Sequence, residues 1–124
     1  MGNAISWFDI PVADMDRAIK FYGTLLDKKL SLMEGSPSPY VLLNPDDFES
    51  VGGGLALLPD HKPSKDSGTV VYLNGGNDLN DMLARIEPAG GKVIQEKMGI
   101  GEGNGFIAYF LDTEGNKVAL HSPA

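Results

Sequence analysis

The chain repeats one order of patterns in its two halves. Residues 5–12 alternate like a strand and run into an amphipathic stretch that opens at Asp14. Residues 69–74 run into a second amphipathic stretch that opens at Asp78, and short apolar segments follow in each half. A single strand–helix unit is common, but two in tandem are a much narrower pattern. The sequence therefore predicts an α+β fold of two tandem βαβββ modules, which form a curved mixed sheet around a cleft.

Turn residues and periodicity set the expected boundaries. Module one spans about residues 4–58, a polar linker with two prolines spans 59–68, and module two spans about 69–123 of a single domain. The first helix carries one apolar stripe: Met15, Ala18, Ile19, Tyr22, Leu25 and Leu26. The second helix carries Leu79, Met82, Leu83 and Ile86 at helical spacing. Besides the first strand, strands are expected at 29–34, 40–43, 53–58, 69–73, 92–96, 106–111 and 117–121.

Composition excludes several classes of protein. The net charge of −7 argues against a nucleic-acid partner, which requires a basic face, and against an anionic membrane surface. The chain has no cysteine, so disulfides, thiolate nucleophiles and cysteine metal sites are excluded. The sequence shows no signal-peptide pattern and no apolar stretch long enough to span a membrane. We expect a cytoplasmic protein without nucleic-acid or membrane partners.

Both ends of the chain resemble a known superfamily. Trp7–Asp14 (WFDIPVAD), followed by Ala18–Tyr22 (AIKFY), is similar to the first strand and helix of the vicinal oxygen chelate superfamily. Phe110–Pro123 (FLDTEGNKVALHSP) resembles its closing hairpin. The superfamily includes glyoxalase I, bleomycin-resistance proteins and extradiol dioxygenases. The resemblance covers essentially the whole chain and implies modules that pair within the chain or across a homodimer, with the homodimer favoured.

The resemblance also locates a metal site that this sequence does not complete. In the metal-dependent members, the first and last strands of each module offer His, Glu or Gln to a divalent ion. The resemblance implies that Trp7, Ala56, Thr69 and Ala119 stand at these four positions, and none is a good ligand. We therefore expect no metal and no cofactor.

Two polar residues are expected on the cavity face. Asp9 shares a strand face with Trp7, and His121 shares one with Ala119. Together they form an acid–base pair or the start of a metal site, or else they lie at strand ends in solvent. Trp7, the only tryptophan, provides a flat wall for an aromatic or cationic ligand or fills the space of a metal.

The glycine-rich loop at 99–105 leads into a strand rather than a helix, so it lacks the features of a phosphate-binding loop. We expect a mobile flap at the cleft, with Glu102 in contact with a ligand. The predicted ligand-binding residues are Trp7, Asp9, Ala56, Thr69, Val71, Glu102, Ala119 and His121.

Three classes of function follow from these features. The first is a small-molecule binding protein of the bleomycin-resistance kind, with the ligand in the cleft and no metal. The second is a glyoxalase-type lyase or isomerase, which depends on a metal or uses Asp9 and His121 for proton transfer. The third is an accessory domain that binds a partner protein. The missing metal ligands favour the first class.

Overall fold

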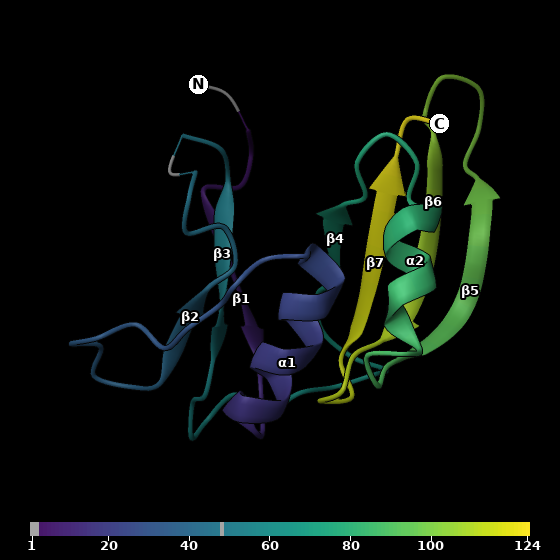
Figure 1. Cartoon of the computed structure of the whole chain (residues 1–124). Helices are drawn as coiled ribbons and strands as arrows, with labels where there is room; N and C mark the ends of the chain where they lie inside the picture. The colour runs from purple at the N-terminus through teal and green to yellow at the C-terminus, as the bar shows by residue number, and fades with distance from the viewer. Residues whose placement is uncertain (1–2, 48) are drawn as a thin grey trace.

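The alternating segments build two separate sheets, each with one helix. The computed structural model describes residues 3–47 and 49–124 (Figure 1). Module one contains β1 (Trp7–Pro11), α1 (Met15–Leu26), β2 (Tyr40–Leu42) and β3 (Gly52–Ala56). Module two contains β4 (Val71–Asn74), α2 (Asn80–Ile86), β5 (Lys92–Gly99), β6 (Phe106–Leu111) and β7 (Lys117–Ser122). The predicted α+β class with two modules is confirmed.

The strands of the two sheets are connected in the same way, as the repeat in the sequence predicts. The N-terminal sheet has the order β1-β3-β2, and the C-terminal sheet has the order β4-β7-β6-β5. In each sheet the first strand of the module pairs in parallel with the last strand, and the remaining pairs are antiparallel. A helix makes the crossover to the far edge of each sheet, as a parallel pair requires.

Helix α1 begins where the sequence predicts. The side chain of Asp14 accepts a hydrogen bond from the amide of Arg17 at 3.1 Å, which satisfies one of the free amides of the first turn. The helix ends at Asp27, whose left-handed backbone (φ 53°) turns the chain away. Its buried face consists of Met15, Ala18, Phe21, Tyr22 and Leu25, so Phe21 joins the predicted stripe while Ile19 and Leu26 are only half-buried.

Helix α2 is shorter and begins just after the predicted residue. The carboxylate of Asp78 accepts from the amide of Asn80 and from Nζ of Lys97, both at 3.0 Å. Leu79 and Ile86 are fully buried, and Met82 is nearly so. Neither of the helices in the described residues is long and apolar enough to cross a membrane.

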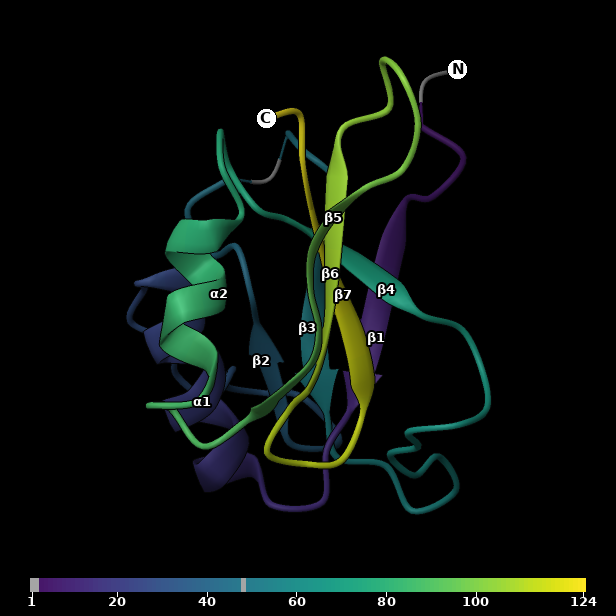
Figure 2. The same cartoon turned by 90° about the vertical axis from the view of Figure 1, so that its right-hand side faces the viewer.

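Both helices lie in the angle between the two sheets (Figures 1 and 2). They contribute to one continuous core, which includes Phe21, Tyr22, Leu55, Ile86 and Phe110. The ring of Phe21 in α1 lies 5.9 Å from that of Phe110 in β6, so the core joins the two modules. The opposite face of each sheet is turned outward. We call these two surfaces the open faces.

One segment differs from expectation. Residues 29–34 form no strand, and only an isolated bridge joins Leu32 to Val41. Leu30 is buried, but Leu32 and Met33 are about half exposed, so this stretch has too little apolar surface on the core to hold a full edge strand. The linker is partly ordered, because the backbone of Ser64 pairs with Lys117 and with the side chain of Asn116.

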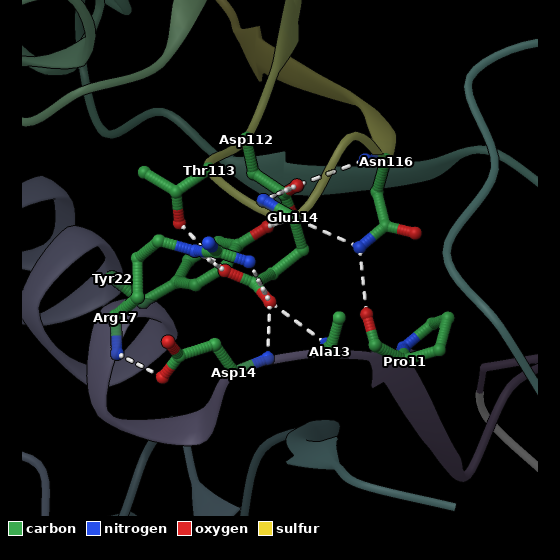
Figure 3. Close-up of polar contacts among 9 residues, drawn as sticks. All are labelled: Pro11, Ala13, Asp14, Arg17, Tyr22, Asp112, Thr113, Glu114 and Asn116. Carbon is green, nitrogen blue, oxygen red and sulfur yellow. Dashed lines mark hydrogen bonds and ion pairs between the residues drawn. The ribbon is translucent and has the colours of Figure 1, made fainter. Parts of the chain in front are cut away.

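A second junction between the modules is polar. The turn between β6 and β7 places Glu114 against the start of α1, where its carboxylate accepts from the amides of Ala13 and Asp14 at 2.7 Å each (Figure 3). Arg17 donates to the same carboxylate through Nε at 2.7 Å and through Nη2 at 3.1 Å. A carboxylate at a helix N-terminus is favoured because it meets free amides and the positive end of the helix dipole.

Beside Glu114, a buried carboxylate organises the turn. Asp112 accepts from the hydroxyl of Tyr22 at 2.6 Å, from the side chain and amide of Asn116, both at 2.9 Å, and from the amide of Glu114 at 2.9 Å (Figure 3). Asn116 also donates to the carbonyl of Pro11 at 2.7 Å, which ties the turn to β1. The Asp-Thr-Glu-Gly-Asn sequence that resembles a family turn therefore fixes the two modules relative to each other.

Candidate functional site: the open faces of the two sheets

The open face of the N-terminal sheet carries the predicted residues Trp7 and Asp9 on β1. Strand pairing aligns them with Gly52 and Gly54 of β3, and the same face continues through Ala56. Trp7 is 43% exposed, and Asp9 is exposed as well. Ala56 is buried, so it forms part of the floor beneath neighbouring side chains. The structure therefore brings together three of the predicted ligand-binding residues.

A tyrosine from β2 links the two β1 side chains. The indole Nε1 of Trp7 donates to the hydroxyl of Tyr40 at 2.6 Å, and that hydroxyl donates to Oδ1 of Asp9 at 2.5 Å. Burial raises the pKa of Tyr40 to about 12, and its hydrogen bond to Asp9 adds to the rise. Tyr40 is therefore a neutral hydrogen-bond donor at physiological pH, and it holds Asp9 in one orientation.

The middle strand, β3, has only glycine beneath these rings. A Cβ atom at Gly52 would lie 2.8 Å from Cζ3 of Trp7, and a Cβ atom at Gly54 would overlap the ring of Tyr40. Both rings thus lie against backbone where any other residue would hold them away. Gly52 and Gly54 have this role on the open face, whereas Gly53 lies against the ring of Phe8 on the other side of the sheet.

The open face of the C-terminal sheet carries a pair of tyrosines. Tyr72 of β4 and Tyr109 of β6 lie on either side of Ala119 of β7, and their hydroxyls are 2.7 Å apart. Their rings meet edge to face at 6.0 Å, and Nζ of Lys117 lies 4.4 Å from the centre of the Tyr109 ring. Tyr72 is 48% exposed, while Ala119 is buried beneath the pair. The small side chain of Ala119 leaves room for both rings.

Two predicted residues lie away from the open faces. Val71 pairs with buried Val118 and packs against the core, because it points to the helix-covered side of β4. Thr69 is exposed and precedes β4, in a small hollow of about 140 Å³ shared with the linker. Tyr72, one residue from Val71, occupies the open face instead.

Two other predicted residues meet at the far end of the C-terminal sheet. Glu102 and His121 line an open hollow of about 560 Å³ beneath the glycine-rich loop. Nε2 of His121 donates to the carbonyl of Asn104 at 2.9 Å, which holds the loop to β7. Asp9 and His121 therefore belong to different sheets, and each has its own hydrogen-bond partner.

The donor set does not fit a divalent ion. Within residues 3–47 and 49–124, no three side chains of the His, Cys, Asp or Glu type converge. On the open faces, the rings of Trp7 and Tyr72 lie beside Gly52 and Ala119. Rings and methyl groups do not supply the nitrogen and oxygen ligands that a catalytic metal requires.

Comparison with known proteins gives the family. The sequence profile of the Glyoxalase/Bleomycin resistance protein/Dioxygenase superfamily matches residues 4–120. The chain belongs to this superfamily. The match confirms the resemblance that the two end motifs indicate, for a member without the usual metal ligands. A search of the curated proteins found no match.

Several solved structures share the fold at low identity. A glyoxalase/bleomycin resistance protein from Albidiferax ferrireducens T118 aligns over 98% of this chain and 100% of its own, with 17% identity and a TM-score of 0.72. TnmS3, an antibiotic binding protein from Streptomyces sp. CB03234, aligns over 98% and 97%, with 20% identity and a TM-score of 0.62. The fosfomycin resistance protein FosX from Listeria monocytogenes aligns over 100% and 96%, with 13% identity and a TM-score of 0.67.

Sequence reasoning missed the three tyrosines of the open faces. Tyr72 was detectable, because Val71 and Leu73 are the apolar residues of that strand and their alternation leaves Tyr72 on the other face. Tyr40 and Tyr109 carry no such signal. Their hydroxyls find partners two strands away, across β3 and across β7, only once the sheets are formed.

Proposed function

We propose that this superfamily member binds a small organic molecule against its open faces, as a homodimer and without a metal ion. The observation that carries the proposal is the exposed aromatic surface of the N-terminal sheet, where Trp7 remains 43% exposed although its indole N–H is already hydrogen-bonded. Exposed rings held in a fixed arrangement are characteristic of binding surfaces.

The homodimer supplies the second wall of the cleft. Within one chain the helices occupy the angle between the sheets, so each open face lacks a facing wall from its own chain (Figures 1 and 2). Large apolar side chains stay exposed on both sheets, including Trp7, Tyr72 and Met98. A second copy that lays its C-terminal sheet over the N-terminal sheet of the first would cover these side chains and enclose a ligand between aromatic walls.

Two further observations support binding without a metal. The central positions of the open faces offer rings and small side chains rather than metal ligands. The aligned structures include TnmS3, described as an antibiotic binding protein, which shares the fold over nearly its whole length. A chain of this fold can therefore serve as a binding protein.

The test is fluorescence of Trp7, which is the only tryptophan and thus reports on one place. The purified protein is titrated with a library of small aromatic molecules, and saturable quenching is expected for some of them. Trp7→Phe removes the fluorescence signal, so calorimetry with the same compounds serves as a measurement of binding that does not depend on fluorescence. Light scattering is expected to give the mass of a dimer. Absence of binding to any compound would contradict the proposal.

A metal measurement tests the proposal that the protein binds its ligand without a metal ion. Elemental analysis of protein purified without chelators is expected to find less than one divalent ion per chain. A stoichiometric, tightly held ion would overturn the metal-free part of the proposal and restore the lyase or isomerase alternative.

A further inference from the structure

The open face of the N-terminal sheet is a flat aromatic platform. The rings of Trp7 and Tyr40 rest against the backbone of β3 at Gly52 and Gly54, where side chains are absent. The hydrogen bonds from Trp7 to Tyr40 and from Tyr40 to Asp9 lock the two rings in place before any ligand arrives. A preorganised surface of this kind binds a planar ring without losing side-chain entropy at the moment of contact.

Asp9 places a negative charge at the edge of the platform. Its Oδ1 accepts from Tyr40, whereas its Oδ2 has no hydrogen-bond donor among the residues that the structure describes. In the described part of the chain the ion pairs involve Asp46, Asp66, Asp78 and Glu114, and Asp9 is in none of them. The carboxylate thus retains an uncompensated charge and free acceptor capacity beside exposed aromatic rings.

These features together specify the chemistry of a ligand. A planar ring stacked on Trp7 covers the exposed apolar surface of the indole. A protonated nitrogen on that ring can donate a hydrogen bond to Oδ2 of Asp9. A cation is also attracted by the face of the indole ring. We infer that the N-terminal open face selects planar aromatic cations, in which an amine or amidinium on the ring meets Asp9. This inference rests on the proposed binding function and adds the ligand class to it.

Tyr40 acts as a positioning residue in this arrangement. Its hydroxyl accepts from the indole and donates to Asp9, so it sets both the plane of the ring and the direction of the carboxylate. Its pKa of about 12 keeps the hydroxyl protonated over the whole physiological range. Loss of this hydroxyl would leave the phenyl ring in place while it frees Asp9 to rotate.

The experiment compares two probes that share one ring system. Proflavine is a planar cation at neutral pH, and acridine carboxylate is its anionic counterpart. Affinities are measured by Trp7 quenching and by calorimetry on the intact protein. The wild-type protein is expected to prefer the cation by about tenfold, the ratio that one charge-assisted hydrogen bond supplies at a partly exposed site.

Three variants test whether the Asp9 carboxylate causes the preference for the cation. Asp9→Asn is expected to bring the two affinities to within roughly twofold of each other. Asp60→Asn removes the same charge from an exposed turn distant in sequence and should retain the full preference, which separates a local contact from the net charge of the protein. Tyr40→Phe is expected to lower the preference while it preserves binding, whereas a merely structural role would weaken both probes alike.

The outcomes are distinguishable from failure of the proposed function. Equal affinity for both probes, or a preference that survives Asp9→Asn, would overturn the inference. If neither acridine binds while other library members quench Trp7, the ligand class is wrong and the binding function stands. If no compound of any charge binds, both proposals fall.

Discussion

Arg17 of module one and Glu114 of module two form an ion pair at 2.7 Å across the junction between the modules (Figure 3). The Glu114 side chain is fully buried there, while that of Arg17 is about half exposed. Because the same carboxylate also accepts from two amides at the start of α1, the closing hairpin serves as a cap for a helix that lies about one hundred residues earlier in the chain. This contact and the shared core together join the two modules.

Glu114→Gln should destabilise the protein by about 2 kcal/mol, because it replaces a buried charged acceptor of several hydrogen bonds with a neutral amide. Urea unfolding followed by circular dichroism measures the loss. Glu34→Gln, which changes an exposed residue by the same chemistry, should leave the stability nearly unchanged. Equal stability of the two variants would show that the Glu114 contact adds little.

Acid should weaken the native protein partly through Glu114. Burial acts to raise the pKa of this carboxyl, but the hydrogen bonds from Arg17 and the two amides outweigh burial, so the pKa lies below its ordinary value of 4.5. A lowered native pKa gives stability that is present above 4.5 and is lost as the pH falls through the native value.

The unfolding free energy of Glu114→Gln should therefore converge on that of the native protein as the pH is lowered below 4.5. Asp112 acts in the opposite direction in both proteins, because burial raises its pKa, and the comparison cancels its contribution. A difference between the two proteins that stays constant down to acid unfolding would refute the linkage.

Alkaline titration should reveal Tyr40. Its pKa of about 12 lies above the ordinary 10.0, so its contribution to stability is complete below pH 10 and is lost as the pH rises toward 12. The native protein and the Tyr40→Phe variant differ in phenolate absorbance by the contribution of Tyr40. This difference should therefore rise near pH 12 rather than near pH 10. A titration midpoint at pH 10.0 for this difference would mean that the hydroxyl of Tyr40 is exposed to solvent.

Gly54→Ala should lift the ring of Tyr40 from β3. The new methyl group overlaps that ring, which is the outer end of a side chain and is able to move, so the fold should survive with a loss of about 1–3 kcal/mol. The emission of Trp7 is expected to change because its hydrogen-bond partner is displaced. Gly99→Ala is the matched control, since a methyl group there finds ordinary contact at 3.6 Å from Phe106. Similar emission spectra for both variants would argue against the platform.

Local patterns predicted the helices and most of the strands. The Asp14 cap and the apolar stripe of α1 depend on residues within a few positions of each other, and the structure reproduces both. The stretch at 29–34 shows where this reasoning ends. Its alternation is that of a strand, but Leu32 and Met33 find no core to pack against, so only one bridge forms. Alternation alone does not reveal whether a facing surface exists.

The site was less predictable than the fold. Alternation along a strand predicts that Trp7 and Asp9 share one face, and strand pairing aligns them with Gly52 and Gly54. The sequence predicts Val71 as a ligand-binding residue, but the structure puts its neighbour Tyr72 on the open face. A shift of one residue reverses the face of every side chain in a strand, and a short strand gives little pattern to fix that register.

The sequence by itself determined the duplicated modules, the family and the scarcity of metal ligands, because these depend on residue types and on periodicities within one element. Only the tertiary structure decided which faces are open and which side chains meet. Trp7, Tyr40 and Asp9 join across β1 and β2, and Glu114 reaches the first turn of α1. Such contacts depend on the pairing and packing of distant segments, and a hydrogen bond between distant side chains has no periodic signature in the sequence.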